Sequence, residues 1–386
     1  MKKRVRDKSL AIVAERLSGG GVEKVLDTIL RHIDKHCVSI TVYASHKETE
    51  YLPIDGLKYK YYFETLSHND SRSTVLAKKL KNKIKLYIYY HFSPQLFYSL
   101  FIREKYDTVV GFLEGYATRI ASGAQKDTRK IAWVHTDMEE YHWSRIAFRN
   151  DSEEYACYST FEKVICVSKK IAAGMQALFK TGERTRILYN PIDRDAILAG
   201  AKAPVLVQSP IKGKIKLLTV GSLVSVKGFI RLLECLRKLC DDGLDLSLTI
   251  VGDGPEKEAI KDKIRFLSLE ERVLLVGFKP NPYPYFANAD IYVCSSFAEG
   301  FSTVITEALV LSCPIVATDC SGVREQLGNS EWGLVTLNND DALRIGISRL
   351  ASDDNLRAFY SSRAAKAGQK YSLQANLKAI ETLLFE

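Results

Sequence analysis

The sequence predicts an α/β protein built from two doubly wound parallel sheets. Short β-branched and apolar runs alternate with longer amphipathic segments along the chain, which is typical of β-α-β units. The length of 386 residues suits two domains, each with its own core. Residues 199–213 are small and punctuated by Pro and Gly. We therefore expect a first domain over 1–192 and a second over 205–371, joined by this linker.

The candidate strands are short apolar runs bounded by turn residues. In the first half they are 9–14, 38–43, 108–112, 130–134 and 163–167, and in the second half 216–220, 247–251, 273–276, 291–294 and 315–318. Helical spacing of apolar residues predicts helices over 22–36 and 304–311. Ser302 or Thr303 is placed to cap the second of these helices. A last helical pattern covers 372–386.

Composition argues against several classes of protein. Apolar residues make up 46% of the chain, and every apolar run is shorter than the roughly 20 residues that a membrane span needs. The first apolar run ends at Glu15 and Arg16, so we expect no signal peptide. The eight cysteines include no C-x-x-C pair, which favours buried thiols over a disulfide framework or a zinc site. A cytoplasmic location is therefore expected.

The net positive charge is confined to the first half of the chain. Residues 1–200 carry 33 Lys and Arg against 24 Asp and Glu, whereas residues 201–386 carry 22 of each kind. Within the first half, segment 74–101 combines five lysines with eight aromatic or histidine rings. This composition fits either a helix with a solvated lysine face and aromatic residues in the core, or an interfacial helix on an anionic membrane. No nucleic-acid-binding module is recognisable, so we expect no nucleic-acid partner.

Two glutamates, Glu299 and Glu307, span the entry of the helix predicted after strand 291–294. A helix N-terminus offers free N–H groups and a positive dipole end to an anion such as a diphosphate. Glu307, inside the helix, could accept hydrogen bonds from a ribose diol, and Glu299 could approach a sugar attached beyond the phosphates. On spacing alone, two solvated glutamates around an ordinary helix explain the pattern equally well.

Five motifs occur in register along the chain. The segment that contains the two glutamates reads E-G-F-S-x-x-x-x-E and is followed by P-I-V-A-T-D-x-x-G-x-x-E. Upstream lie SGGGVEKVL at 18–26, TVGSLVSVKGF at 219–229, TIVGDGPEKEAI at 249–260 and LLVGF at 274–278. Together they resemble the family 4 glycosyltransferases, retaining enzymes of which many build bacterial surface polysaccharides. The resemblance covers nearly the whole chain and implies the GT-B fold, in which two Rossmann-like domains face each other across a cleft. In that fold the last helix crosses back to the first domain.

The resemblance implies a nucleoside-diphosphate sugar as donor, bound mainly by the second domain. Lys227 and the helix N-terminus would neutralise the diphosphate. The implied donor-binding residues are Gly20, Gly21, Gly221, Ser222, Lys227, Gly252, Asp253, Gly277, Phe278, Glu299, Gly300, Phe301, Ser302, Thr303 and Glu307. Many relatives carry an arginine where this chain has Ser222, so another cation such as Arg324 could contribute, although Arg324 could equally be a surface residue.

The implied catalytic residues are Glu299, Lys227 and His135. His135 follows strand 130–134, at the carboxyl end of a parallel sheet, where α/β proteins bind ligands. It matches the acceptor-side histidine of the family. Gly20 and Gly21 would allow the backbone to approach the diphosphate or the acceptor. Because S-G-G-G-V-E is not G-x-G-x-x-G, a dinucleotide cofactor is disfavoured.

The sequence therefore predicts a transferase that moves a hexose-type sugar from a UDP or GDP donor to a hydroxyl of a glycan or lipid-linked glycan. Retention of configuration is implied by the resemblance. No His/Cys ligand cluster is present, so neither a metal nor a cofactor beyond the co-substrate is expected. A GT-B sugar-nucleotide epimerase and a non-catalytic glycan-binding GT-B subunit are the alternatives. If 74–101 is interfacial, the protein works at the inner face of the cell membrane.

Overall fold

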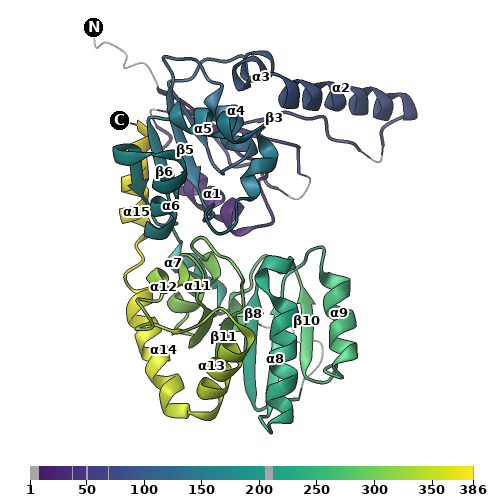
Figure 1. Cartoon of the computed structure of the whole chain (residues 1–386), viewed down its shortest axis with the longest axis vertical. Coiled ribbons are helices and arrows are strands. Elements are labelled where there is room, and N and C mark those ends of the chain that lie inside the picture. The colour runs from purple at the N-terminus through teal and green to yellow at the C-terminus, as the bar shows by residue number, and fades with distance from the viewer. Residues whose placement is uncertain (1–7, 37, 49–50, 68, 205–211, 386) are drawn as a thin grey trace. The chain divides into compact units, whose positions relative to one another are not determined.

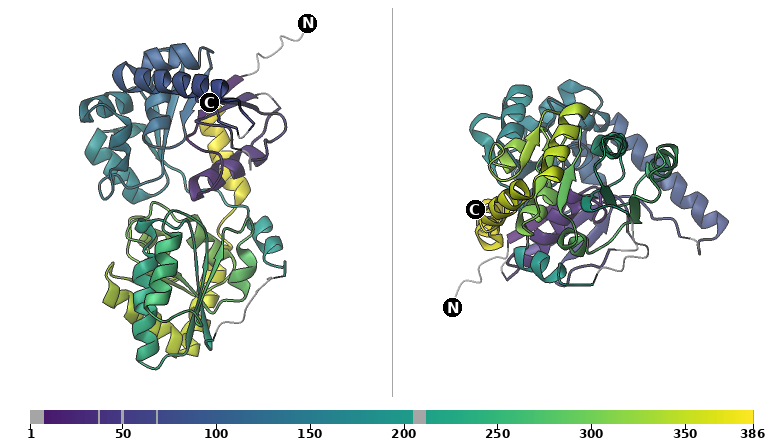
Figure 2. Two further views of the ribbon diagram at one scale, coloured as in Figure 1. Left: turned by 90° about the vertical axis from the view of Figure 1, so that its right-hand side faces the viewer. Right: turned by 90° about the horizontal axis from the view of Figure 1, so that it is seen from below.

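The computed structural model describes residues 8–36, 38–48, 51–67, 69–204 and 212–385. They divide into two compact units, Met1–Tyr189 with Gln374–Glu386, and Asn190–Leu373. Each unit contains one parallel sheet with helices on both faces (Figures 1 and 2), so the predicted fold class is confirmed.

The boundary between the units lies earlier in the chain than the expected linker. Helix α7 (Arg194–Gly200) was expected before the second domain but belongs to the second unit, because Ile197 packs against Val310 in a common apolar cluster. Residues 205–211 of the expected linker lie outside the described residues.

The first unit is built around a seven-stranded sheet with the order β3-β2-β1-β4-β5-β6-β7. Its strands are β1 (Lys8–Val13), β2 (Val38–Ala44), β3 (Lys58–Tyr61), β4 (Thr108–Gly111), β5 (Arg129–Val134), β6 (Lys163–Cys166) and β7 (Thr185–Ile187). Its helices are α1 (Gly21–His32), α2 (Arg72–His91), α3 (Pro94–Phe101), α4 (Tyr116–Ser122), α5 (Asp151–Ser159), α6 (Lys169–Phe179) and α15 (Leu373–Phe385), with 3-10 turns η1 (Trp143–Ala147) and η2 (Gly182–Arg184). The chain runs outward from β1 to β3 and returns to the other side of β1, so the topological switch point lies between β1 and β4.

The second unit is built around a six-stranded sheet with the order β10-β9-β8-β11-β12-β13. Its strands are β8 (Ile215–Val220), β9 (Leu246–Val251), β10 (Val273–Gly277), β11 (Ile291–Cys294), β12 (Ile315–Thr318) and β13 (Leu334–Thr336). Its helices are α7, α8 (Phe229–Asp241), α9 (Lys257–Phe266), α10 (Tyr283–Ala287), α11 (Thr303–Val310), α12 (Val323–Gln326), α13 (Asp340–Ser352) and α14 (Asp354–Gly368), with the 3-10 turn η3 (Ser225–Lys227). The same winding rule places the switch point of this sheet between β8 and β11.

Ten of the strands were predicted, and the three that were missed all lie at sheet edges. These are β3, β7 and β13. An edge strand is short and partly exposed, so it lacks the continuous apolar run that marks a central parallel strand. The predicted helix over 22–36 ends earlier, at His32. The last helix, α15, packs on the first unit, where Arg129 donates a hydrogen bond to the carbonyl of Leu383.

The cysteines in the described residues are free. All of them are buried except Cys240, which is partly exposed, as expected of small apolar side chains. Cys37 lies outside the described residues. Among the helices of the described ranges, none combines the length and the apolar character that crossing a bilayer requires.

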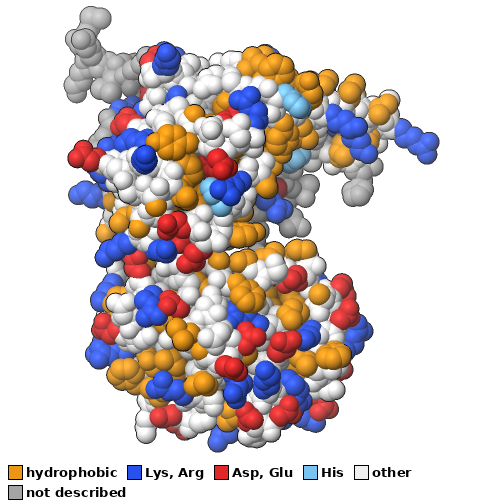
Figure 3. All heavy atoms as spheres, viewed as in Figure 1, with side chains coloured by type: hydrophobic (Ala, Val, Ile, Leu, Met, Phe, Trp, Pro, Cys, Tyr) orange, Lys and Arg blue, Asp and Glu red, His pale blue; other side chains and the backbone are white. Residues whose placement is uncertain are grey.

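Helix α2 projects from the body of the first unit and exposes an apolar stripe (Figures 1 and 3). The α2 stripe consists of Leu76, Leu80, Ile84 and Tyr87, which recur at helical spacing, and each of the four is more than half exposed. A helix of a globular protein normally turns such a stripe toward the core. Here the usual orientation is reversed.

Two lysines on the less exposed side of α2 have polar partners. Lys78 pairs with Asp70 at 2.8 Å, and Lys85 donates to the carbonyl of Tyr62 at 2.6 Å. A fully solvated lysine face is therefore the wrong expectation for these two residues. The lysines at 79, 81 and 83 are exposed beside the α2 stripe.

A buried arginine anchors the C-terminal end of α2. Arg119, on α4, donates to the carbonyls of Tyr89 and Phe92 and forms hydrogen bonds of 3.2 and 2.8 Å with the Glu153 carboxylate. Its guanidinium lies 4.3 Å from the centre of the Tyr89 ring. The guanidinium has no access to water. The Glu153 carboxylate balances its charge, and the carboxylate and the two carbonyls accept its hydrogen bonds.

We predict that Arg119→Met lowers the free energy of unfolding by about 3–5 kcal/mol. The change leaves two carbonyls without this donor and removes two hydrogen bonds from the buried Glu153 carboxylate, which keeps Arg149 as a partner. Chemical denaturation followed by circular dichroism measures the change. The matched control is Arg145→Met, which removes an exposed arginine that pairs with Asp151 at 3.4 Å and should cost less than about 1 kcal/mol. Equal losses in the two variants would contradict the anchoring role.

Candidate functional site

Two predicted site residues form an ion pair at the switch point of the second sheet. Lys227 lies in η3 after β8, and Glu299 lies in the loop after β11. Nζ of Lys227 is 2.7 Å from Oε1 of Glu299. The Glu299 side chain is 8% exposed and the Lys227 side chain 28% exposed. The pair is thus largely withdrawn from water but open on the lysine side.

The charge on Lys227 is maintained by this partner. Burial disfavours the ammonium, but the nearby Glu299 carboxylate outweighs that effect and raises the pKa of Lys227. The lysine therefore stays protonated at neutral pH and is a cation at the carboxyl edge of the sheet. Such a cation is what a diphosphate requires.

Glycines allow the loops at this edge to pack backbone against backbone. A Cβ atom on Gly252 would lie 1.8 Å from the carbonyl oxygen of Gly221, and one on Gly228 would lie 2.2 Å from that of Ser295. Gly252 and Gly228 also have positive φ angles of 154° and 66°. Any side chain at these positions would push the loops apart.

Helix α11 begins directly beyond Glu299. The hydroxyl of Ser302 caps the helix by accepting from the N–H of Ile305, and Gln326 donates to the carbonyl of Ser302 at 2.6 Å. The Glu307 side chain, one turn further on, is 1% exposed. Because Glu307 is buried and the Glu299 side chain is only 8% exposed, the interpretation of two solvated glutamates is wrong.

The other predicted donor-side residues surround this edge. Gly221 and Ser222 follow β8, and Gly221 donates its N–H to the carbonyl of Val251 at 3.0 Å. Asp253 pairs with Lys257 at 2.7 Å.

Further predicted positions lie beyond β10 and before α11. Gly277 adopts a φ of 80° at the end of β10, and Phe278 after it is exposed. Gly300 packs against Gly322. A Cβ atom on Gly322 would lie 1.8 Å from the carbonyl oxygen of Gly300. Phe301 is buried just before the cap of α11, and Thr303 is the first residue of the helix.

Arg324, the alternative cation, forms hydrogen bonds of 3.0 and 3.1 Å with Asp319. Its charge is therefore already paired within the second unit. Within the described ranges, no group of three or more His, Cys, Asp or Glu side chains is placed to hold a metal ion.

In the first unit, His135 is held by a buried carboxylate. The backbone N–H of His135 donates to Glu114 at 2.9 Å, and the indole N–H of Trp143 donates to the other oxygen at 3.1 Å. Burial raises the pKa of Glu114 and lowers the pKa of His135 to about 3. The imidazole is therefore neutral at any working pH. Its Nε2 atom is buried and has no hydrogen-bond partner among the described residues.

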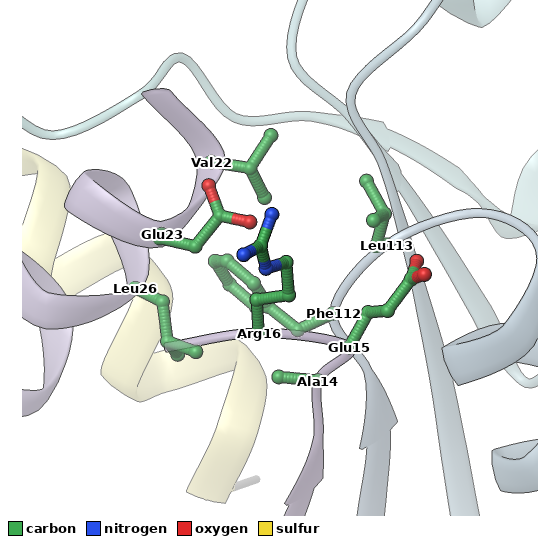
Figure 4. A pocket seen from close by; sticks show the side chains of 8 residues that line it. All are labelled: Ala14, Glu15, Arg16, Val22, Glu23, Leu26, Phe112 and Leu113. Atoms are coloured by element: carbon green, nitrogen blue, oxygen red, sulfur yellow. The ribbon is translucent and has the colours of Figure 1, made fainter. Parts of the chain in front are cut away.

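A small pocket lies at the switch point of the first sheet (Figure 4). Apolar side chains from α1 and from the loops after β1 and β4 line it together with Glu15, Arg16 and Glu23. Figure 4 shows Arg16 beside Glu23, with Glu15 further along the same wall. Burial raises the pKa of both Glu15 and Glu23. Gly20 and Gly21 begin α1 at this pocket, and the Glu23 carboxylate lies over Gly20, where a Cβ atom would approach its Oε2 atom to 2.4 Å.

Sequence reasoning missed three residues that hold predicted site residues in place within their own units. Glu114 binds the His135 loop, and Ser296 donates to Glu299 Oε1 at 2.6 Å. Asn190, the first residue of the second unit, donates to the carbonyl of Phe301 at 3.2 Å. Their position in the sequence could have identified two of them. Glu114 and Ser296 each lie just after a predicted strand, as His135 does.

Comparisons with known proteins agree with this geometry. Residues 206–367 match the family model described as Glycosyl transferases group 1, and residues 19–196 match the model described as Glycosyltransferase Family 4. The chain is 39% identical over 196 residues to the N-acetylgalactosamine-N,N'-diacetylbacillosaminyl-diphospho-undecaprenol 4-alpha-N-acetylgalactosaminyltransferase of Campylobacter jejuni, a match that covers 50% of this chain and 52% of that relative. The amylovoran biosynthesis glycosyltransferase AmsD of Erwinia amylovora is 21% identical over 98% of this chain and 99% of its own length.

Solved structures share the fold. The HepE protein of Anabaena, crystallised with UDP, superposes with a TM-score of 0.70 at 19% identity, over 97% of this chain and 99% of its own. The sucrose-phosphate synthase of Thermosynechococcus elongatus gives a TM-score of 0.72 at 15% identity, over 97% and 98% of the two chains. Since the two family models together match nearly the whole chain and both sheets are wound as in GT-B proteins, the chain belongs to the family 4 glycosyltransferases.

Proposed function

We propose that this protein transfers a hexose-type sugar from a UDP or GDP donor to a hydroxyl of a glycan or lipid-linked glycan, with retention of configuration. The observation that carries the proposal is the Lys227–Glu299 pair beside the N-terminus of α11, at the switch point of the second sheet. No metal or further cofactor enters the proposal.

The second unit is the donor side of the reaction. As the sugar leaves, negative charge grows on the diphosphate, and a lysine together with free helix amides stabilises that charge. Lys227 and the N-terminus of α11 are assigned this work. Glu307 binds the ribose, and Glu299 holds the hydroxyls of the donor sugar or stabilises its oxocarbenium-like centre. The acceptor attacks from the side of the leaving group, which yields retention.

The first unit is the acceptor side of the reaction. His135 acts as a neutral hydrogen-bonding group toward the sugar or the acceptor, because its imidazole is uncharged and its Nε2 lacks a partner among the described residues. The pocket beside Gly20 and Gly21 offers carboxylates and an arginine, which suit the hydroxyl groups of a glycan.

The relatives support the choice of substrates. HepE has been crystallised with UDP-glucose, which favours a uridine donor. The name of the Campylobacter relative specifies a 4-alpha-N-acetylgalactosaminyl transfer to a sugar on diphospho-undecaprenol. A lipid-linked acceptor of that kind lies in a membrane, so the enzyme would have to work at a membrane surface. We place it at the cytoplasmic face of the cell membrane.

The α2 stripe supports a peripheral contact with an anionic membrane. Its apolar side chains are exposed and are accompanied by the exposed lysines at 79, 81 and 83. Apolar side chains can insert at the level of the headgroups while the neighbouring ammonium groups bind anionic lipids. The first unit would thereby meet a lipid-linked acceptor in the bilayer.

We expect Lys227→Ala to weaken the binding of UDP or GDP about tenfold or more, because it removes a charge-assisted contact of roughly 1.5–3 kcal/mol. Isothermal titration calorimetry provides the affinity. The matched control is Lys263→Ala, a lysine of similar exposure (23%) that pairs with Glu234 on the helices of the same unit and should leave affinity unchanged. Unchanged affinity in the Lys227 variant would remove Lys227 from the donor site.

Glu299→Gln and His135→Ala are each expected to lower turnover about 100-fold while the fold persists. The reaction is followed with UDP- and GDP-sugars and a glycan acceptor, and proton NMR of the new linkage reports its configuration. Since the pKa of His135 lies near 3, the pH profile between 5 and 8 should keep its shape in the His135→Ala variant. A fully active Glu299→Gln variant, or an inverted product, would contradict the mechanism.

Co-sedimentation with liposomes tests the membrane contact. The protein should bind vesicles that contain anionic lipid, bind neutral vesicles weakly, and dissociate as salt rises. Leu80→Asp with Ile84→Asp should abolish binding, whereas Ile345→Asp, an equally exposed position on α13, should not. Negligible binding to every vesicle would favour an acceptor in solution.

A further inference from the structure

The loop that follows β11 begins with two buried serines that contact the two charged residues of the site. Ser295 donates its hydroxyl to the carbonyl of Lys227 at 3.0 Å. Ser296 donates its hydroxyl to the Glu299 carboxylate at 2.6 Å. The side chains of consecutive residues in extended chain point in opposite directions, so one serine serves each partner.

Ser296 is itself held firmly in place. Its carbonyl oxygen accepts hydrogen bonds from the hydroxyl of Thr318 at 2.5 Å and from the thiol of Cys320 at 3.0 Å. Thr318 is the last residue of β12, the neighbouring strand, and Cys320 lies two residues beyond it. The backbone of Ser296 is therefore tied to the sheet.

The carboxylate of Glu299 is contacted on one side only. Its donors among the described residues all reach Oε1, namely Nζ of Lys227 at 2.7 Å, Oγ of Ser296 at 2.6 Å and Sγ of Cys294 at 3.9 Å. The terminal torsion of a glutamate is soft, so these contacts fix the plane of the carboxylate and the direction of its second oxygen. They leave Oε2 for a substrate.

Binding of the donor would affect the hydrogen bonds of Lys227 and Ser296 to Glu299 differently. Under the proposed function, the ammonium of Lys227 is drawn toward the diphosphate, and its bond to Glu299 weakens. The hydroxyl of Ser296 has no such competing partner, because it lies buried behind the carboxylate. It is then the remaining short hydrogen bond that orients Glu299.

We propose that Ser296 is a positioning residue, which holds Oε1 of Glu299 so that Oε2 is presented to the sugar of the donor. This inference rests on the proposed function and adds to it the residue that orients the sugar-facing carboxylate. Ser296 acts through Glu299 and makes no contact with the reacting atoms.

The test compares turnover with nucleotide binding in Ser296→Ala. We expect kcat to fall about 10- to 100-fold, since a short hydrogen bond to a charged group is lost. KM for the donor and the affinity for UDP should stay within about twofold, because the diphosphate site is untouched. Ser296→Thr restores a hydroxyl and should recover most of the turnover, whereas Ser296→Cys, of similar shape but a weak donor, should not.

The matched control is Ser122→Ala in the first unit. That serine is equally buried, and its hydroxyl contacts the carbonyl of Arg119 at 2.7 Å and Sγ of Cys157 at 3.2 Å. It should change melting temperature as much as Ser296→Ala does and leave kcat unchanged. The control separates a general loss of stability from the loss of orientation at Glu299.

Three results would overturn the inference. They are wild-type kcat in Ser296→Ala, an equal loss of kcat and UDP affinity in that variant, and no recovery in a folded Ser296→Thr variant. If the wild-type enzyme is active and Ser296→Ala has the same kcat, the role of Ser296 is refuted but the proposed function is not. A wild-type protein that turns over no nucleotide sugar with or without acceptor refutes the proposed function, and this inference falls with it.

Discussion

The candidate donor site depends on the close approach of backbones at the carboxyl edge of the second sheet. The loops after β8, β9 and β11 meet there without intervening side chains, since Gly228 and Gly252 each press against the carbonyl of a neighbouring loop. This contact brings Lys227 and Glu299, which are 72 residues apart in sequence, to within 2.7 Å. Parallel strands alone bring loops to the same edge, but only glycine lets them touch.

The predicted site residues of the two units are held in different ways. In the second unit, the carboxylate of Glu299 is paired with the ammonium of Lys227, and this pairing raises the pKa of the lysine. In the first unit, no charged partner among the described residues reaches the His135 ring, and burial keeps the ring neutral, while Glu114 accepts from N–H donors. A charged group suits a diphosphate, and a neutral hydrogen-bonding group suits a hydroxyl.

Helix α2 shows how a polar anchor can support an exposed apolar surface. Arg119 fastens the C-terminal end of the helix through backbone carbonyls, and the lysines at 78 and 85 fasten its inner side. These contacts do not need the side chains of the α2 stripe, which are left outside. The side chains of the α2 stripe do not pack against the rest of the unit, so they are available to contact a partner.

The sequence by itself determined the fold class, the central strands and most of the residues at the candidate site. Buried parallel strands need continuous apolar runs, and loops that approach one another need glycines, so both leave marks in the chain. Edge strands, the start of the second unit and the roles of Glu114 and Ser296 were decided by tertiary structure. A serine or glutamate after a strand looks alike whether it is solvated or buried. Its partner, such as Glu299 for Ser296 or the His135 N–H for Glu114, is chosen only when the loops fold onto one another. The outward direction of the α2 stripe was decided in the same way, because the period of a helix shows that a stripe exists but not which side faces the core.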